Sequence, residues 1–249
     1  MPELAPNSIT FLPLNDDVLC VFMIMINFII QISVTADTSH LTNGKNGDSG
    51  IIIYADICCM SNPLIAYLQL FRHMDESEQQ LIEAAFVSRQ FKEGDSLFES
   101  GRVCREMFFI YKGILRIMAR NEKGNEVTHF FLKENQFCTI LNSFNNLIPA
   151  EESIQAACDA EVLVISKSKV EELYGQLPFL KELITQITQQ ALLDKIQIRN
   201  SYLGQDSSTR YQLFMMRQPE IALRVPLSEI ASYLGITPQS LSRIRRNVK

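Results

Sequence analysis

The sequence has little of what most catalytic and metal sites require. Its six cysteines include no C-x-x-C pair, and its three histidines (His40, His73 and His129) form no H-E-x-x-H motif. These spacings do not match the usual zinc or iron–sulfur signatures. No catalytic constellation and no phosphate-binding loop of the Walker type is evident. We therefore expect no enzymatic activity, no metal and no cofactor, and we expect reduced thiols in a cytoplasmic protein.

A large excess of charge of one sign is also missing, but the charge is unevenly distributed. The whole chain carries a formal net charge of −5, whereas residues 205–249 hold seven basic and three acidic side chains. An acidic body with a basic C-terminal end can bind a polyanion at that end alone. A solvated charged helix would explain the same charges, so charge by itself leaves both interpretations open.

Residues 1–59 differ in character from everything that follows. The segment 18–36 has nineteen uncharged residues, close to the roughly 20 apolar residues that cross a bilayer. No Lys or Arg precedes Lys45, so the usual flanking charges of a secretory signal or a membrane helix are missing. Three interpretations stay open: a start-site artefact with Met60 as the true first residue, a membrane anchor, or a poorly packed extension. We favour the first and expect no membrane association.

Residues 60–168 are predicted to form an antiparallel double-stranded β-roll behind a short helical lead. The sequence Asp75-Glu-Ser-Glu78 is a capping box and predicts a helix that ends near Arg89. Short β-rich runs separated by glycine turns follow, which is typical of a jelly-roll-like fold. These runs are Phe91, Leu97–Phe98, Met107–Tyr111, Ile114–Met118, Val127–Leu132 and Glu161–Ser166. With the helices further along the chain, the predicted fold class is α+β.

The first strands resemble the cyclic-nucleotide-binding type of roll. The pattern is Phe91-x-x-Gly94-Asp95-x-Leu97-Phe98-x-x-Gly101, followed by Phe109-Ile110-x-x-Gly113-x-Leu115-Arg116. Ligand-binding members of that superfamily continue with a phosphate cassette. In this cassette the Glu of a Gly-Glu pair takes a ribose hydroxyl, and an arginine pairs with the cyclic phosphate.

The corresponding stretch of this chain carries no positive charge. Residues 134–166 contain no Lys or Arg, and Ala150 stands near the position of the family's arginine. Because a buried phosphate needs basic groups or convergent N–H donors, we expect that cyclic AMP and cyclic GMP do not bind. A different, neutral effector and a purely structural roll are the alternatives. A degenerate effector pocket would be lined by Phe137, Thr139, Asn142, Ser143 and Ala150.

Residues 169–204 are predicted to form a dimerisation helix. Ser168-x-x-Glu171 is a capping box for a short first helix that Gly175 can end, and Pro178 suits the first position of the next helix. About 26 residues then run without Gly or Pro, which gives roughly 39 Å of helix. Apolar residues on more than one side suggest that it packs against its own roll and against a second copy. One face is marked by Leu180, Leu183, Ile184, Ile187, Ala191 and Ile198, and it is widened by Phe179, Leu192, Leu193, Ile196 and Tyr202.

Residues 205–249 contain a helix-turn-helix pattern. Apolar residues occupy the positions that hold two such helices together, namely Ile230, Leu234, Ile236, Leu241 and Ile244. Ala231 is small where the helices cross, and Gly235 supplies a left-handed turn. Thr237 is predicted to cap a second helix that begins at Pro238. We expect no wing hairpin after that helix.

The second helix of this motif carries the chemistry expected of DNA readout. Its exposed positions Gln239, Ser240 and Arg243 are predicted to contact bases, since Gln can pair with adenine and Arg with guanine. Contacts to the DNA backbone are predicted for Ser228, Thr237, Ser242, Arg245 and Arg246. An ordinary helical hairpin with a basic end that the helix dipole favours is the simpler alternative.

Roll, long helix and helix-turn-helix in this order resemble the Crp/Fnr family of bacterial transcription regulators, over about residues 60–249. The resemblance implies a homodimer on double-stranded DNA, with half-sites about 34 Å apart and RNA polymerase as a further partner. The family's recognition helix often reads Arg-Glu-x-x-x-Arg, whereas Pro238, Gln239 and Arg243 stand here, so we expect a different operator. The rival hypothesis is a membrane-tethered sensor or protein-interaction module in which residues 18–36 span the bilayer.

Overall fold

Two short helices lead into the body of the protein in the computed structural model, which describes residues 62–247. They are α3 (Pro63–Gln69) and α4 (Glu76–Ala85). The predicted capping box of α4 is confirmed: the Asp75 carboxylate accepts a hydrogen bond from the Glu78 N–H, and the Glu78 carboxylate accepts one from the Asp75 N–H. The predictions made for residues 1–59 lie outside the described residues.

Helix α4 is shorter than the sequence predicted. It ends at Ala85, and Arg89 lies instead in strand β1 (Val87–Phe91), which pairs with residues 160–164. The prediction that the helix continues to Arg89 was therefore wrong. The hydrogen bonds between β1 and a strand distant in the sequence determine where the helix ends, and the spacing of apolar residues within the helix gives no information about that partner.

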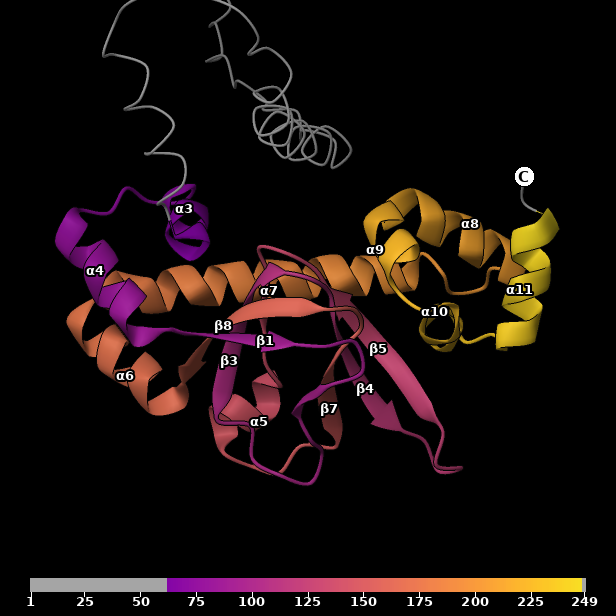
Figure 1. Ribbon diagram of the computed structural model, residues 1–249, viewed down its shortest axis with the longest axis horizontal. Coiled ribbons are helices and arrows are strands. Elements are labelled where there is room, and N and C mark those ends of the chain that lie inside the picture. The colour runs from indigo at the N-terminus through magenta and orange to yellow at the C-terminus, as the bar shows by residue number, and fades with distance from the viewer. Residues whose placement is uncertain (1–61, 248–249) are drawn as a thin grey trace, which may run out of the picture. The chain divides into compact units, whose positions relative to one another are not determined.

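Strand β1 is the first of the eight antiparallel strands that form the roll within residues 62–247 (Figure 1). The others are β2 (Ser96–Phe98), β3 (Glu106–Lys112), β4 (Leu115–Arg120), β5 (Glu126–Leu132), β6 (Phe137–Cys138), β7 (Glu152–Ala156) and β8 (Ala160–Ser166). One sheet has the order β1-β8-β3-β6 and the other β2-β7-β4-β5. The predicted roll and its β-rich runs are confirmed. Sequence reasoning missed β6 and β7, which are short or mostly polar, and helix α5 (Leu141–Asn146) between them.

The turn from β3 to β4 depends on glycine. Gly113 has a φ of +103°, in the left-handed region that L side chains rarely adopt. A Cβ at this position would lie 2.5 Å from the Cα of Ala160, so the roll closes only because this residue has no side chain.

Side chains that point into the roll form one apolar cluster. Its members come from both sheets and include Phe108, Ile110, Leu115, Leu132, Ile154 and Val162, all buried. Alternation along each strand directs these residues inward and their neighbours outward. The inside of the roll is therefore filled largely by the protein's own hydrocarbon.

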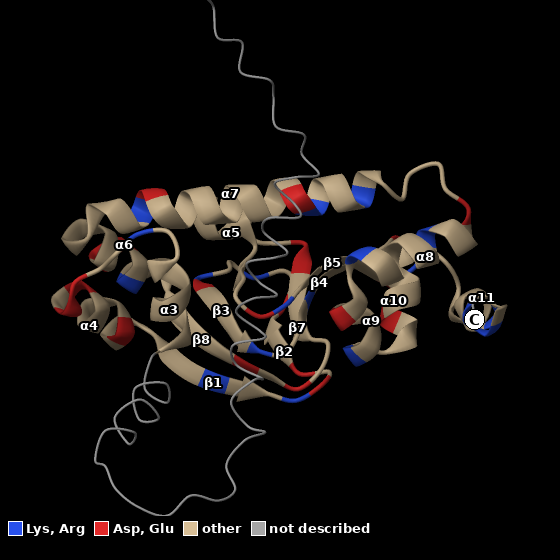
Figure 2. Ribbon diagram, turned by 90° about the horizontal axis from the view of Figure 1, so that it is seen from above, with Lys and Arg blue, Asp and Glu red and all other residues tan. Residues whose placement is uncertain are grey.

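Two helices follow the roll, α6 (Lys167–Gln176) and α7 (Pro178–Asn200). Figure 2 shows α7 as a single uninterrupted helix, and Pro178 is its first residue, as predicted. The cap of α6 is Ser166 rather than Ser168, because the Ser166 hydroxyl is the one that accepts a backbone hydrogen bond. Gly175 lies inside α6 and does not end it, which corrects the second part of that prediction.

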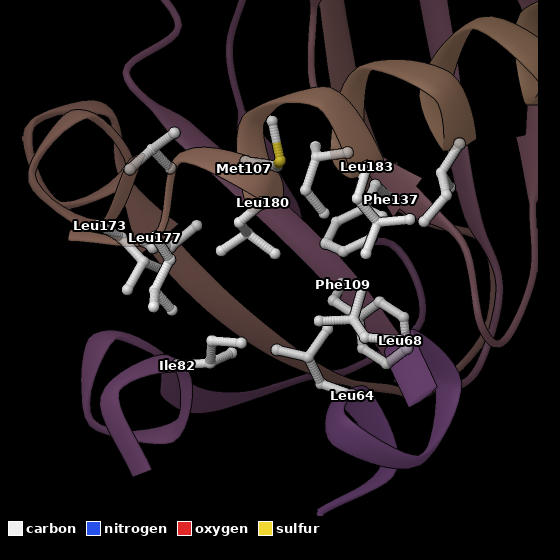
Figure 3. Close-up of a cluster of buried hydrophobic side chains, with 14 of the residues drawn as sticks. Leu64, Leu68, Ile82, Met107, Phe109, Phe137, Leu173, Leu177, Leu180 and Leu183 are labelled. Carbon is white, nitrogen blue, oxygen red and sulfur yellow. The ribbon is translucent and has the colours of Figure 1, made fainter. Parts of the chain in front are cut away.

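The N-terminal half of α7 packs against its own chain (Figure 3). Its residues join an apolar cluster with side chains from α3, α4, α6 and the outer face of the first sheet, namely Leu64, Leu68, Ile82, Met107, Phe109, Phe137, Leu173 and Leu177. Of the six residues predicted to mark the dimer face, Leu180, Leu183, Ile184 and Ile187 are buried here, and Ala191 and Ile198 are half-buried. The first four therefore serve the contact with the roll, not a free surface.

Four helices complete the described chain: α8 (Ser207–Arg217), α9 (Pro219–Arg224), α10 (Leu227–Leu234) and α11 (Pro238–Asn247). Helix α10 packs against β5, and a third apolar cluster joins the two regions. Ile114, Phe131 and Ala157 of the roll belong to this cluster together with Phe214 of α8 and Ala231 of α10. Among residues 62–247 no helix has both the length and the apolar character needed to cross a membrane.

Candidate nucleic-acid interface

Helices α10 and α11 have the geometry of a helix-turn-helix. Gly235 ends α10 with a φ of +66°, and the Ile236 N–H donates to the Ala231 carbonyl at 3.0 Å. The Thr237 hydroxyl accepts a hydrogen bond from the Ser240 N–H at 3.2 Å, so the predicted cap of α11 is present. Leu241 and Ala231 are fully buried where the two helices meet. The local signals of the sequence therefore predicted this element correctly.

The residues predicted to read DNA lie on the side of α11 that faces away from this core. Gln239, Ser240 and Arg243 are exposed, whereas Leu241 is buried and Ile244 is half-buried. Of the predicted backbone contacts, Ser228, Thr237, Arg245 and Arg246 are exposed and Ser242 is half-buried. Helix α11 contains three arginines and no acidic residue, and Figure 2 shows its basic segments in blue.

Three of these side chains already have partners within α11 or its cap. The Thr237 hydroxyl donates to the Ser240 hydroxyl at 2.9 Å, and Nε of Arg246 approaches the Ser242 carbonyl at 3.4 Å. Both contacts are exposed, so they can exchange for a phosphate or a base edge at little cost. Gln239 and Arg243 are free of such contacts among the described residues.

The five residues predicted to line an effector pocket in the roll are not brought to one cavity. Phe137 lies in the cluster beneath α7, with its ring 5.1 Å from that of Phe109. Asn142 is exposed on α5 and accepts a hydrogen bond from Asn146. Thr139, Ser143 and Ala150 are buried, the last in the cluster inside the roll.

The buried hydroxyls of this region are satisfied by the protein itself. Thr139 donates to the Glu106 carbonyl at 2.9 Å, and Ser143 accepts from the Cys104 N–H at 2.8 Å while donating to the Ile148 carbonyl. A ligand here would have to displace these bonds, which costs the desolvation of each group left unpaired.

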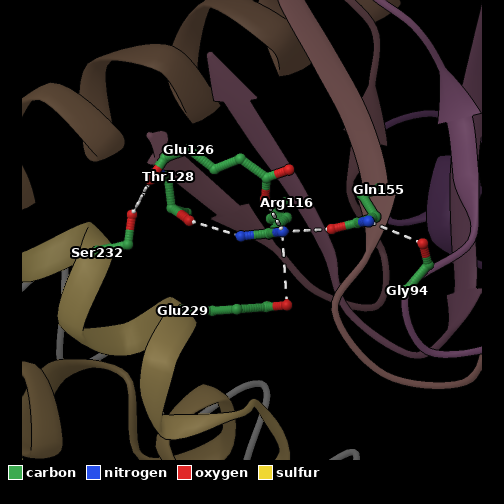
Figure 4. Close-up of polar contacts among 7 residues, drawn as sticks. All are labelled: Gly94, Arg116, Glu126, Thr128, Gln155, Glu229 and Ser232. Carbon is green, nitrogen blue, oxygen red and sulfur yellow. Dashed lines mark hydrogen bonds and ion pairs between the residues drawn. The ribbon is translucent and has the colours of Figure 1, made fainter. Parts of the chain in front are cut away.

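Arg116 is the last residue of the glycine-containing pattern Phe109–Arg116 and lies in β4. Its side chain does not face the inside of the roll (Figure 4). Its strand neighbours Leu115 and Ile117 point inward, so the Arg116 side chain projects from the opposite face of β4. There its Nε donates to Gln155 at 2.7 Å, and its Nη2 donates to Glu126 at 2.8 Å. Glu229 of α10 approaches the same Nε at 3.5 Å.

This arginine is part of a polar junction between the roll and the helix-turn-helix. Ser232 of α10 accepts a hydrogen bond from the Thr128 N–H at 2.9 Å and donates to the Glu126 carbonyl at 3.0 Å. Arg224 of α9 makes two hydrogen bonds to Glu134, at 2.7 and 3.0 Å. Sequence reasoning missed the whole junction, because its partners are distant in the chain and carry no shared motif.

Glu229 is the carboxyl that this junction perturbs most. Burial raises its pKa to about 7, the charge of Arg116 opposes that rise, and the carboxylates of Glu93 and Glu126 add to it. Its Oε2 is buried without a hydrogen-bond partner among the described residues. The junction therefore contains a group that can change charge near neutral pH.

Comparison with known proteins agrees with this architecture. Residues 88–176 match the cyclic nucleotide-binding domain, which covers the strands of the roll and α6. The c-di-GMP-responsive global regulator CLP of Xanthomonas campestris superimposes with a TM-score of 0.55 at 15% identity, over 70% of this chain and 91% of that chain. This chain has the fold of the Crp/Fnr regulators.

Two further structures with the Crp/Fnr fold support the same assignment. FixK2 of Bradyrhizobium japonicum has a TM-score of 0.54 at 15% identity, over 66% of this chain and 84% of that chain. A protein from Eubacterium rectale, assigned to the Crp/Fnr transcriptional regulators, has a TM-score of 0.55 at 18% identity, over 73% of this chain and 87% of that chain. A comparison with curated protein sequences finds no match. At these identities the Crp/Fnr likeness establishes the fold.

Proposed function

We propose that this protein is a homodimeric, sequence-specific DNA-binding transcription regulator whose roll has lost the ability to bind cyclic nucleotides. The observation that carries the proposal is helix α11. It follows a left-handed Gly235 turn, and it presents Gln239 and Arg243 on an exposed face that contains no acidic residue. Such a helix fits the major groove, where Gln and Arg read base edges.

The overall charge distribution supports the same function. Residues 205–249 have a formal charge of +4, while residues 1–204 have −9. A strongly acidic body is repelled by DNA, so it favours approach through the basic end. Arg245 and Arg246 extend the basic face beyond the residues proposed to contact bases.

A second copy of the chain is proposed to pack on the C-terminal half of α7. Leu192, Leu193 and Ile196 lie within about one turn there and are 40%, 54% and 42% exposed. The N-terminal half already buries its apolar side chains inside the chain, so these three residues form the apolar surface that is left over. We assign the dimer contact to them rather than to Leu180, Leu183, Ile184 and Ile187.

Loss of cyclic-nucleotide binding is proposed from the composition of the roll. Residues 134–166 supply no basic side chain, and Arg116 is committed to the junction with α10. The buried Thr139 and Ser143 hydroxyls are used by backbone carbonyls and an N–H. A cyclic phosphate in this roll would therefore stay unpaired, at a cost of several kcal/mol.

The test begins with genome-wide mapping of sites bound by the untagged full chain. Binding is then titrated on a recovered site and on a scrambled sequence of equal length, and sedimentation gives the stoichiometry. We expect two chains per site, a paired recognition sequence with half-sites about one helical turn apart, and clear preference over scrambled DNA. Equal affinity for both DNAs, or a single chain bound per site, would contradict the proposal.

A further inference from the structure

A cavity of about 240 Å³ lies between the roll and the helix-turn-helix. Its walls come from β5, the C-terminal end of α7, α8, and the end of α10 with its following turn. The residues used below are Thr128, His129, Arg199, Tyr202, Arg210 and Ser232. On the same measure one water molecule needs roughly 10–15 Å³, so the cavity has room for a small organic molecule.

The lining of this cavity is basic and lacks acidic residues. Arg199 of α7 and Arg210 of α8 both line it, together with His129 of β5, and no Asp or Glu does so. Neither arginine is in an ion pair among residues 62–247, in contrast to Arg116 and Arg224, which pair with carboxylates at the same junction. The other arginines of the junction are therefore paired with carboxylates, whereas these two form no ion pair among the described residues.

Contacts within the protein hold Arg210 in place without neutralising it. Its Nη1 donates to the Leu234 carbonyl and its Nη2 donates to the Ser207 hydroxyl, while its Nε is buried without a hydrogen-bond partner. Asp206 lies close enough for the charge of Arg210 to lower its pKa, but the two form no ion pair, and the Asp206 carboxylate caps α8 through the Ser208 and Thr209 N–H groups. Arg210 thus contributes a fixed positive charge, and the exposed Arg199 contributes a guanidinium that is free to bind.

The neutral polar groups of the cavity are already used. Ser232 exchanges hydrogen bonds with β5, and the Thr128 hydroxyl accepts from Arg116 at 3.3 Å. The Tyr202 hydroxyl accepts from Gln218 at 3.0 Å. Among the polar groups of the cavity, those left to bind a ligand are therefore chiefly the positively charged ones, and guanidinium groups bind carboxylate or phosphate oxygens.

His129 also lines the cavity, and its protonation should depend on whether an anion is bound there. Burial lowers its pKa, the charge of Arg199 lowers it further, and Glu152 opposes both. A bound anion would offset the repulsion from Arg199, so binding would favour the protonated imidazole. Anion affinity should accordingly rise as the pH falls and His129 becomes protonated.

We propose that this cavity binds a small metabolite carrying phosphate or carboxylate groups, and that this ligand is the effector of the protein. The cavity is lined by β5 of the roll, the end of α7, α8 and the turn of the helix-turn-helix, so one ligand would touch the roll, the long helix and the two helices, α8 and α10, that pack against α11. The effector would thus bind at the junction between the roll and the helix-turn-helix, instead of inside the roll, where cyclic nucleotides bind in the family that the sequence resembles. The effector role rests on the proposed function, whereas anion binding does not.

The first experiment measures binding to the full chain by isothermal titration calorimetry, with pyrophosphate, citrate and glucose as separate probes. We expect saturable binding of one or both anions and none of glucose; pyrophosphate alone indicates a phosphate ligand and citrate alone a carboxylate ligand. Arg199→Ala should weaken anion binding about tenfold or more, because a charge-assisted contact is lost. Arg217→Ala removes an exposed arginine outside the cavity and should leave the affinity unchanged.

Absence of saturable binding by both anions up to about 10 mM would overturn the assignment, as would equal losses in the two variants. The Arg199 side chain has no hydrogen-bond or ion-pair partner among the described residues, so its replacement should leave the fold intact, and circular dichroism checks this. DNA binding is titrated separately with and without the bound anion. A change in DNA affinity in the unmodified chain but not in Arg199→Ala supports the effector role. An unchanged affinity overturns that role while leaving the DNA-binding function standing.

Discussion

Replacement of Glu229 by glutamine should remove a pH-dependent component of stability from the junction. The Glu229 side chain is 12% exposed and lies 3.5 Å from Nε of Arg116, whose side chain is 7% exposed. Burial raises the Glu229 pKa from its ordinary value of 4.5 to about 7, against the opposing charge of Arg116. The folded protein therefore holds the Glu229 proton more tightly than the unfolded chain does.

The sign and size of the effect follow from this difference. The stabilising contribution is fully present below about pH 4.5 and is lost as the pH rises through about 7. One pKa unit corresponds to about 1.4 kcal/mol, so the shift corresponds to at most about 3 kcal/mol. Partial access of solvent to the carboxyl reduces the expected loss to about 2 kcal/mol.

Urea unfolding of the full chain and of Glu229→Gln, followed by far-UV circular dichroism, measures this contribution at pH values from 4.5 to 8. The two proteins should have similar free energies of unfolding near pH 4.5. Near pH 8 the variant should be more stable by about 2 kcal/mol, because glutamine never acquires the buried charge. Glu122→Gln, on the exposed turn between β4 and β5, controls for the loss of one negative charge. A difference that does not change with pH would refute the reasoning.

Four other outcomes are expected. Arg243→Ala should weaken binding to the specific site by about 1–3 kcal/mol and relax the preference at one base position. Arg246→Ala should weaken binding to all sequences equally and lower the slope of log affinity against log salt concentration by about one per subunit. DNA-binding titrations at several salt concentrations separate the two effects. Calorimetry with cyclic AMP and cyclic GMP should show no micromolar binding by the full chain. Leu193→Glu should produce monomers in sedimentation, while Leu223→Glu, at an 81% exposed position outside α7, should not. A chain that begins at Met60 should be folded and dimeric, and aggregation would show that the preceding residues are structural.

Elements whose signals are local were predicted well from the sequence. Asp75 caps α4, Pro178 begins α7, and Gly235 turns between α10 and α11, each where the sequence placed it. In these cases a few neighbouring residues fix the backbone through one hydrogen bond or one φ angle. Even so, the serine that caps α6 was misassigned by two residues, because Ser166 and Ser168 offer the same hydroxyl.

Features that depend on distant partners were not predictable in the same way. The apolar residues of α7 were recognised, but which of them face the roll depends on how α3 and the first sheet surround Leu180 and Ile184. Arg116 was noticed only as the end of a glycine pattern. Its partners on β5 and α10 become neighbours only after the roll has closed and the last helices have docked.

The apolar cluster that joins roll and helix-turn-helix bears on how separable the two are. A cut near residue 205 would leave Ile114 and Phe131 uncovered on one fragment and Tyr211 and Phe214 on the other. Exposed apolar surface of this kind favours aggregation, so neither fragment should behave as a free-standing module. A chimera that carries the helix-turn-helix of a relative would therefore also need that relative's residues on the face of β5 that packs against α10. We therefore expect the roll and the C-terminal helices to evolve together as one unit, although the sequence pattern alone suggests a series of independent segments.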